Sequence, residues 1–357
     1  TTEREMISTK LEDRFRGLIL GTAVGDALGL PAEGMSPDQI RRRWNGDWKM
    51  RFCFGRGMIS DDTEHTIMVA QSLLACGNDA QKFQRMLAWK LRWWFLALPA
   101  GVGFATARAC LKLWIGVPPS RSGVKSAGNG PAMRAAVIGA FFAHDLAKRR
   151  EFIKISTRLT HTDARAEVAA LTIAETAAWI IRGEKSVEEF LLELPALGQG
   201  EEWLSICRKL ADAYKSKLSV HEFACALGLD RGVTGYAFHT VPVAVYVWIK
   251  HSEDFRTSLI SALDCGGDTD TVGAIVGALA GASSGTAGIP AGWSGRIAEW
   301  PRSVRFMEAL ALQLALTQST KICGKPLRYF WPVVIFRNVF FLLVVLAHGF
   351  RRLLSPY

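Results

Sequence analysis

Two stretches rich in glycine and other small residues restrict most strongly how this chain can fold, residues 17–29 and 266–285. Small side chains recur in both at roughly every fourth position, and such spacing lets two helices approach closely. We therefore predict two buried helices that cross in the core. Other segments rich in Ala, Leu and Ile run longer than strands usually do. Alternating β-branched runs are scarce, so the sequence predicts an all-α fold. The best strand candidate, 241–249, holds a proline that suits the first turn of a helix equally well.

The chain changes character near residues 321–326, and we predict two parts, 1–320 and an extension at 321–357. The extension is strongly apolar and then basic. Its longest uninterrupted apolar run, 339–347, is nine residues long, whereas a helix that spans a bilayer needs about 20. We therefore expect no transmembrane anchor. The alternatives are a helix that packs on the domain or on a second subunit, and an interfacial helix that holds Arg351 and Arg352 near lipid phosphates.

Composition excludes several classes of protein. Apolar residues make up 49% of the 357 residues and charged residues 21%, which rules out wholesale disorder and collagen-like repeats. The net charge of +10 attracts phosphates but does not by itself define a nucleic-acid partner, which we consider the less favoured reading. The polar N-terminus shows no secretory signal, and no cysteine spacing is typical of zinc, so we expect a cytoplasmic protein with reduced thiols. These cysteines are Cys53, Cys76, Cys110, Cys207, Cys225, Cys265 and Cys323.

Two acidic clusters, 60–63 (SDDT) and 268–271 (DTDT), stand where helices should begin. Capping a helix needs one such residue, whereas adjacent carboxylates near a buried surface repel each other unless a cation neutralises them. Oxygen ligands without nearby His or Cys suit Mg²⁺ or Mn²⁺ rather than zinc. Four carboxylates could hold two such ions about 3.5–4 Å apart. Ordinary N-capping is the alternative.

Two glycine-rich segments could also carry chemistry. Residues 25–34 (GDALGLPAEG) lack a preceding strand and the GxGxxG spacing, so a dinucleotide loop is a weak reading. Glu33 in this segment could reach a metal-bound water or the substrate, or simply be solvated. Residues 127–134 (AGNGPAMR) form a turn that enters a helix, where exposed backbone N–H groups could bind a phosphate. An ordinary turn is the alternative there.

Taken in order, GDALG with Glu33, SDDT, GNGPAMR, LTHTD, GYAFHTVPVAVY and DCGGDTDTVGAIVGALAGA resemble the ADP-ribosylglycohydrolase family over about residues 14–300. The resemblance implies an orthogonal bundle of helices and two Mg²⁺ or Mn²⁺ ions. It also implies a hydrolase that removes ADP-ribose from modified protein side chains, with the arginine linkage favoured. By motif position, the implied metal ligands are Ser60, Asp61, Asp62, Asp268, Asp270 and Thr271, with Ser60 in place of the usual Thr.

The same resemblance assigns a substrate loop and catalytic candidates. Asp61, Asp62 and Glu33 are candidates for the base that activates water. Some relatives carry an acid in a segment that corresponds to residues 99–104, where this chain has none, so the identity of the base stays open. The implied substrate-binding residues are Gly128, Asn129, Gly130, Met133 and His161, although His161 could instead serve packing and hydrogen bonding.

Other functions remain to be weighed against this one. Cleavage of the ribosyl bond needs a stabilised oxocarbenium-like transition state, an activated water and help for the leaving group. An inactive relative that binds ADP-ribose or is structural is one alternative, but all four carboxylates are present. A hydrolase for serine-linked or nucleic-acid-linked ADP-ribose is another. We expect residues 327–357 to be an accessory element, so truncation after Leu316 should leave hydrolysis largely intact.

Overall fold

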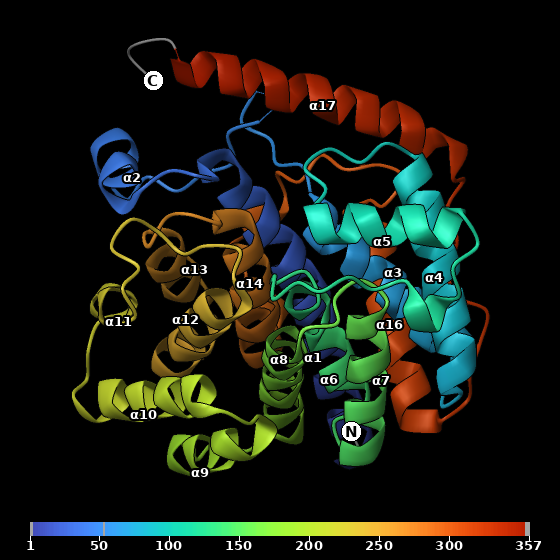
Figure 1. Ribbon diagram of the computed structural model, residues 1–357, viewed down its shortest axis with the longest axis horizontal. Helices are drawn as coiled ribbons and strands as arrows, with labels where there is room; N and C mark the ends of the chain where they lie inside the picture. Colours follow the sequence, from blue (N-terminus) through green and yellow to red (C-terminus); the bar gives the residue numbers. More distant parts are fainter. Residues whose placement is uncertain (1–2, 53, 354–357) are drawn as a thin grey trace.

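The computed structural model describes residues 3–52 and 54–353, and in these ranges it contains helices and no strands (Figure 1). The prediction of an all-α fold is therefore confirmed, and the strand candidate at 241–249 lies inside a helix. The α-helices of the described ranges are α1 (Glu3–Gly29), α2 (Pro37–Trp44), α3 (Asp61–Cys76), α4 (Ala80–Leu96), α5 (Phe104–Trp114), α6 (Ala136–Phe141), α7 (Leu146–Arg158), α8 (Ala164–Arg182), α9 (Val187–Glu193), α10 (Glu201–Lys215), α11 (Val220–Ala226), α12 (Ala237–His251), α13 (Phe255–Leu263), α14 (Thr269–Ser284), α15 (Ala291–Ser294), α16 (Val304–Thr320) and α17 (Pro332–Leu353).

Helices α1 and α14 lie antiparallel in backbone contact. A Cβ atom added to Gly21 would lie 2.0 Å from the carbonyl oxygen of Gly277, and one added to Gly25 would lie 1.8 Å from that of Gly273. No side chain fits at these distances, so glycine is required on both helices. The predicted close approach of two buried helices is confirmed. Its consequence is that the end of α1 meets the beginning of α14.

Helix α3 is the third buried helix at this junction, and its first turns are polar. Asp62, Thr63, Glu64, His65 and Thr66 are all buried, each with 2% exposure or less. Buried polar groups must find partners inside the protein, because water does not reach them. At the beginning of α3, buried side chains therefore make polar contacts instead of apolar ones.

Helix α17 lies across one side of the bundle, along the top of Figure 1, and a buried ion-pair network holds it there. The Arg337 guanidinium, 1% exposed, donates to Glu299 at 2.6 and 2.9 Å and to Glu64 at 3.2 Å. Arg302 also donates to Glu64, at 2.6 Å. The Asn338 amide donates to the carbonyl of Ala97 at 2.8 Å. Arg337 and Asn338 of α17 thus face the protein.

The expectation that the apolar segment is too short to span a membrane was wrong. The helix continues through Arg337 and Asn338, because both lie on its inner face and do not interrupt it. By length and composition alone, one helix in the described ranges could cross a membrane, residues 332–352, with a mean hydropathy of 2.1. Only 22% of its most apolar window is buried inside the protein.

The glycine contact between α1 and α14 can be tested by adding one methyl group. We expect Gly21→Ala to lower the free energy of unfolding by about 3 kcal/mol, because the methyl carbon meets a backbone carbonyl that cannot move aside. Gly292→Ala on α15, where nothing lies within 4 Å of the added carbon, is the matched control and should change stability by less than about 1 kcal/mol. Urea unfolding measures both. Equal stability of the two variants would show that the helices do not touch.

Candidate active site

A buried carboxylate at the end of α1 fixes the beginning of α3. Asp26, fully buried, accepts hydrogen bonds from the backbone N–H of Ser60 at 2.9 Å and from the hydroxyl of Thr63 at 2.5 Å. Burial raises the pKa of Asp26 to about 6, although these hydrogen bonds oppose the rise. The contacts orient the first turn of α3, and with it Asp61 and Asp62.

A tight glycine turn presents the second acidic cluster. Gly266 and Gly267 both have positive φ, and a Cβ atom on Gly267 would lie 1.9 Å from the carbonyl oxygen of Val233. Asp268 follows this turn at the N-cap of α14 and accepts a hydrogen bond from the Asn129 amide at 2.7 Å. Only glycine allows the turn to pack this closely, which explains the pair in the sequence.

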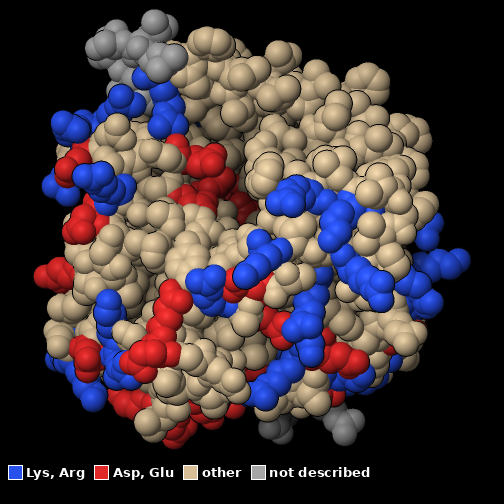
Figure 2. Space-filling view, viewed as in Figure 1, with Lys and Arg blue, Asp and Glu red and all other residues tan. Residues whose placement is uncertain are grey.

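The two clusters meet, although about 200 residues separate them. The Thr271 hydroxyl donates to Asp62 Oδ2 at 3.4 Å, and the Ser60 hydroxyl donates to the same oxygen at 3.1 Å. A cavity of about 660 Å³ opens beside them. Figure 2 shows carboxylates gathered inside a hollow below α17. The predicted residues that line the cavity are Glu33, Asp61, Asp268, Asp270, Thr271, Gly128, Asn129, Gly130, Met133 and His161.

Ser60 and Asp62 are the two predicted site residues that do not line the cavity. Both are nearly fully buried behind it, with exposures of 4% and 1%. The structure therefore brings the predicted site residues into one region, with most of them on the cavity wall and these two directly behind the carboxylates.

Burial and mutual repulsion both act on the carboxylates. The pKa of Asp61 is raised well above its ordinary value, by burial first and then by the charges of Glu64 and Asp26. Burial likewise raises the pKa of Asp62, and Asp26 adds to the rise. Asp270 behaves in the same way, with Glu33 as the largest charged contributor. Such a site favours protons or bound cations.

Two oxygens of this cluster have no hydrogen-bond partner. They are Oδ1 of Asp62 and Oδ1 of Asp270, both buried, and no group in the described part of the chain donates to them. The oxygen-rich surroundings, with the hydroxyls of Ser60 and Thr271 alongside, fit Mg²⁺ or Mn²⁺ by ligand type. However, within residues 3–52 and 54–353 no three His, Cys, Asp or Glu side chains stand close enough to hold a metal ion as arranged. The two-ion centre therefore stays a prediction.

The glycine-rich turn at residues 128–130 rests on His161. A Cβ atom on Gly128 or on Gly130 would lie 3.1 Å from the His161 ring. Burial, and then the nearby charge of Arg134, lowers the pKa of His161 to about 3, so the ring is neutral at physiological pH. His161 lines the cavity and also supports the turn. The Asn129 amide donates to Asp268 and Thr240, which ties the same turn to the acidic cluster.

Several residues that the structure places at the site were not identified from the sequence, and four of them carry charged or aromatic side chains. One is Asp26, whose signal was an acid among small residues on a buried helix. The others, Phe104, Arg108 and Lys125, line the mouth of the cavity. Phe104 is 77% exposed, and the Arg108 guanidinium lies 5.6 Å from the centre of its ring. Exposed basic and aromatic residues are common in any chain, so no pattern singled these out.

Helix α17 also contacts two walls of the site. Arg337 donates to the carbonyl of Ile59, the residue before Ser60, at 2.5 Å. Arg352 donates to the backbone carbonyl of Glu33 at 2.9 Å, and the His348 ring lies 3.0 Å from the carbonyl oxygen of Pro31. Among the described side chains of α17, none lines the cavity. Helix α17 therefore supports the backbone beside the site without lining the cavity. The expected effect of truncation after Leu316 stays a prediction.

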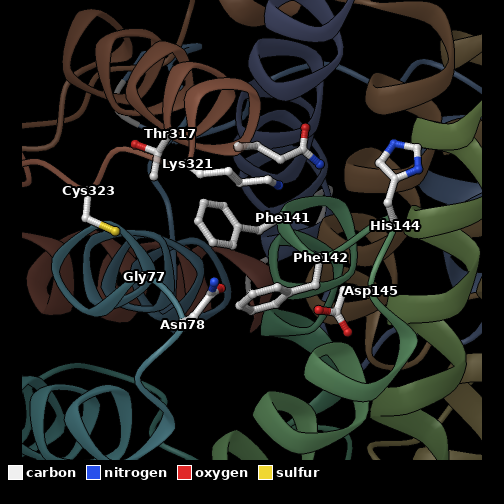
Figure 3. A pocket seen from close by; sticks show the side chains of 10 residues that line it. Gly77, Asn78, Phe141, Phe142, His144, Asp145, Thr317, Lys321 and Cys323 are labelled. Carbon is white, nitrogen blue, oxygen red and sulfur yellow. The ribbon is translucent and has the colours of Figure 1, made fainter.

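The described cysteines and a second cavity offer no rival chemistry. The six cysteines in the described ranges are free, and Cys53 lies outside those ranges. Burial raises the pKa of Cys265 to about 12, which makes it a packed thiol rather than a nucleophile. A cavity of about 290 Å³ lies near the end of α3 and is lined by Phe141, Phe142 and Cys323 among others (Figure 3). It contains none of the predicted site residues.

Comparison with known proteins places this helical fold in a known family. A family model described as ADP-ribosylglycohydrolase matches residues 7–322. A solved structure, titled as an ADP-ribosylglycohydrolase-related protein complex, superimposes with a TM-score of 0.61 at 27% identity and covers 87% of this chain and 99% of its own. The class is thus a helical glycohydrolase. The chain belongs to the ADP-ribosylglycohydrolase family.

The alignments with individual relatives cover most of this chain and most of each relative. An uncharacterised protein from Archaeoglobus fulgidus is 32% identical and covers 85% of this chain and 96% of its own. The ADP-ribosyl-[dinitrogen reductase] glycohydrolase of Rhodospirillum rubrum is 27% identical and covers 82% and 92%. An ADP-ribosylhydrolase of Gallus gallus is 28% identical and covers 78% and 88%. The family resemblance predicted from the motifs is confirmed.

The buried ion pairs of α17 can be tested by removing one arginine. We expect Arg337→Ala to lower the free energy of unfolding by about 3–5 kcal/mol, because Glu299 and Glu64 stay buried and Arg302 is the one ion-pair partner that remains to them among the described residues. Arg328→Ala, an exposed arginine of the same tail, is the matched control and should fall within about 0.5 kcal/mol of wild type. Chemical unfolding measures both, and an equal effect would show that α17 is not anchored through Arg337.

The raised pKa of Asp270 predicts that replacing its carboxyl group stabilises the protein by an amount that depends on pH. The folded protein keeps this proton at pH values where the unfolded chain has released it, so the Asp270 contribution to stability falls as pH rises. Without divalent metal, Asp270→Asn should therefore gain stability relative to wild type as pH rises above the ordinary carboxyl pKa. Thermal melting in a chelator measures the difference.

A second carboxylate supplies a control of opposite sign. Asp254 caps α13, and hydrogen bonds from Thr257 lower its pKa. The stability that its ionised form contributes is present above the ordinary carboxyl pKa and is lost as pH falls. Asp254→Asn should therefore lose stability relative to wild type as pH rises. A difference between Asp270→Asn and wild type that does not change with pH would contradict the electrostatic description of the site.

Proposed function

We propose that this protein is a metal-dependent hydrolase that removes ADP-ribose from modified protein side chains, with arginine the first linkage to test. The observation that carries the proposal is the meeting of two acidic clusters, 60–63 and 268–271, at one cavity of about 660 Å³. A cavity of this size suits a ligand as large as a nucleotide. Family membership supports the same reaction class, and two relatives are named as hydrolases of ADP-ribosylated material.

The acidic residues would hold two Mg²⁺ or Mn²⁺ ions. Ions held there would coordinate ribose hydroxyls and lower the pKa of a coordinated water. The ligand set is Ser60, Asp61, Asp62, Asp268, Asp270 and Thr271. Asp26 orients the first group by capping α3, and Asn129 orients Asp268. The two unpartnered carboxylate oxygens are the natural points of attachment.

The carboxylates on the cavity surface are the candidates for the general base that accepts the proton of the attacking water. Asp61 and Glu33 both line the cavity, and the pKa of each is raised, which brings them nearer to the range of an effective base. Asp62 is buried behind them and is better placed as a ligand than as a base. A carboxylate that takes the proton of the attacking water can return it to the departing acceptor atom, so that hydroxide adds to the ribose carbon and the proton goes to the leaving group.

The mouth of the cavity suits the rest of ADP-ribose. The backbone N–H groups of Gly128 and Asn129 already donate to Ser126 and Gly235. The cations of Arg108 and Lys125 are therefore the groups that can face a diphosphate. Phe104 offers an exposed ring on which the adenine of ADP-ribose can stack. Residues 99–104 carry no acid, so serine-linked and nucleic-acid-linked ADP-ribose remain to be compared with the arginine linkage.

Side-by-side release of ADP-ribose from arginine-, serine- and nucleic-acid-linked substrates tests the proposal. We expect release to need Mg²⁺ or Mn²⁺ and to stop in a chelator. Asp61→Ala should lower turnover by roughly 10²–10⁴, because it removes a ligand and a candidate base. Metal should raise the melting temperature of wild type by mass action and that of Asp270→Asn much less.

Cys265→Ala is the matched control, because its buried thiol lies beside the second cluster without a catalytic partner. We expect its turnover to equal that of wild type. Release that persists in a chelator would contradict the metal-dependent mechanism. Inactivation by a thiol-alkylating reagent that Cys265→Ala relieves would point to covalent catalysis instead.

A further inference from the structure

Helix α17 has its polar side turned toward the protein and its apolar side turned outward. Arg337, Asn338 and His348 lie on its inner side and contact the body of the protein. Phe336 is 74% exposed, Leu343 60% and Phe350 68%. In water this arrangement is unfavourable, because large apolar side chains remain hydrated. The exposed apolar residues of this outer face are Phe336, Val339, Phe340, Leu342, Leu343, Leu346 and Phe350.

The charge of the tail has one sign. Glu308 is the last acidic residue of the chain, and every charged side chain after it is basic. Arg337 is neutralised inside the protein. Lys325 and Arg328 precede α17, and two arginines end it. The outer face of α17 is thus a band of apolar side chains with positive charge at both ends, and Figure 2 shows the uncharged surface along the top of the molecule.

A cavity of about 700 Å³ lies beneath the N-terminal end of α17. Trp89, Trp93 and Trp331 are among its walls, together with methionine side chains. Arg85 and Arg328 stand among four basic residues of its lining, which includes no carboxylate. Apolar walls with basic groups suit an amphiphile that has an apolar body and an anionic head.

We propose that the outer face of α17, together with this cavity, docks on the surface of a membrane that contains anionic phospholipid. The helix lies in the plane of the interface, as amphipathic helices with basic residues do. The apolar face enters the boundary between headgroups and acyl chains, and the basic ends meet lipid phosphates. The cavity takes up the apolar part of a lipid whose head stays near Arg85 and Arg328.

A spanning orientation and a second copy of the chain fit the observations less well. To cross the bilayer, α17 would have to withdraw Arg337 from Glu64 and Glu299, leaving buried charges without their partner. If two copies packed through this face, their basic ends would meet with no carboxylate in either tail to pair with them. Anionic lipid carries the charge opposite to that of these basic ends.

Flotation of the full chain with vesicles tests the proposal. We expect the protein to float with vesicles of phosphatidylcholine that contain about one-third phosphatidylglycerol, and to bind pure phosphatidylcholine and high-salt samples much less. Phe336→Glu combined with Leu343→Glu should lower the bound-to-free ratio by about tenfold or more, because two apolar anchors are lost. Both side chains point away from the protein, so the melting temperature should not change.

Leu192→Glu, which replaces an 80% exposed leucine on α9, is the matched control and should float like wild type. Phe350→Glu gives a second variant at the other end of the outer face and should also reduce flotation. Failure of wild type to float, or equal binding to neutral vesicles, would overturn the proposal. A dimer in sedimentation that Leu343→Glu dissociates would identify a second copy as the occupant. Retention in membranes after alkaline carbonate extraction would show a spanning helix.

Discussion

The backbone contact between α1 and α14 is the constraint on which the site depends. Because Gly21 and Gly25 leave no side chain between the helices, the end of α1 lies against the beginning of α14. Asp26 then reaches the first turn of α3, and the glycine turn before Asp268 fits beside it. Bulkier residues in this contact would move the two acidic clusters apart by the thickness of a side chain. The small residues therefore serve the chemistry as well as the packing.

The acidic cluster shows how a buried site trades stability for function. Burial and mutual repulsion raise the pKa of Asp61, Asp62 and Asp270, so ionising them without cations costs the fold free energy. Neighbouring contacts offset part of this cost by fixing the orientation of each carboxylate: Asp26 caps α3, and Asn129 holds Asp268. A fold that keeps such a cluster must be stable enough elsewhere, and the continuous apolar core supplies that stability.

The sequence predicted the parts of the structure that depend on local pattern. Small residues at helical spacing predicted the α1–α14 contact, and the acidic clusters predicted where α3 and α14 begin. It could not predict contacts between distant segments. Arg337 looked like an interruption of an apolar run, because its partner Glu64 lies 273 positions away. The mouth residue Phe104 likewise depends on how α5 is placed, which no local pattern records.

The inner and outer sides of α17 make different contacts, and each side needs its own explanation. Its inner side contacts the backbone carbonyls of Ile59 and Glu33, so its position affects the segments that carry Ser60 and Glu33. Its outer side contributes nothing to those walls and is constrained only by what it contacts outside the protein. A helix needs no apolar outer face to make the inner contacts, since polar residues there would be better hydrated. The presence of seven large apolar side chains on the outer face therefore needs a separate explanation, and docking on an anionic membrane surface provides one.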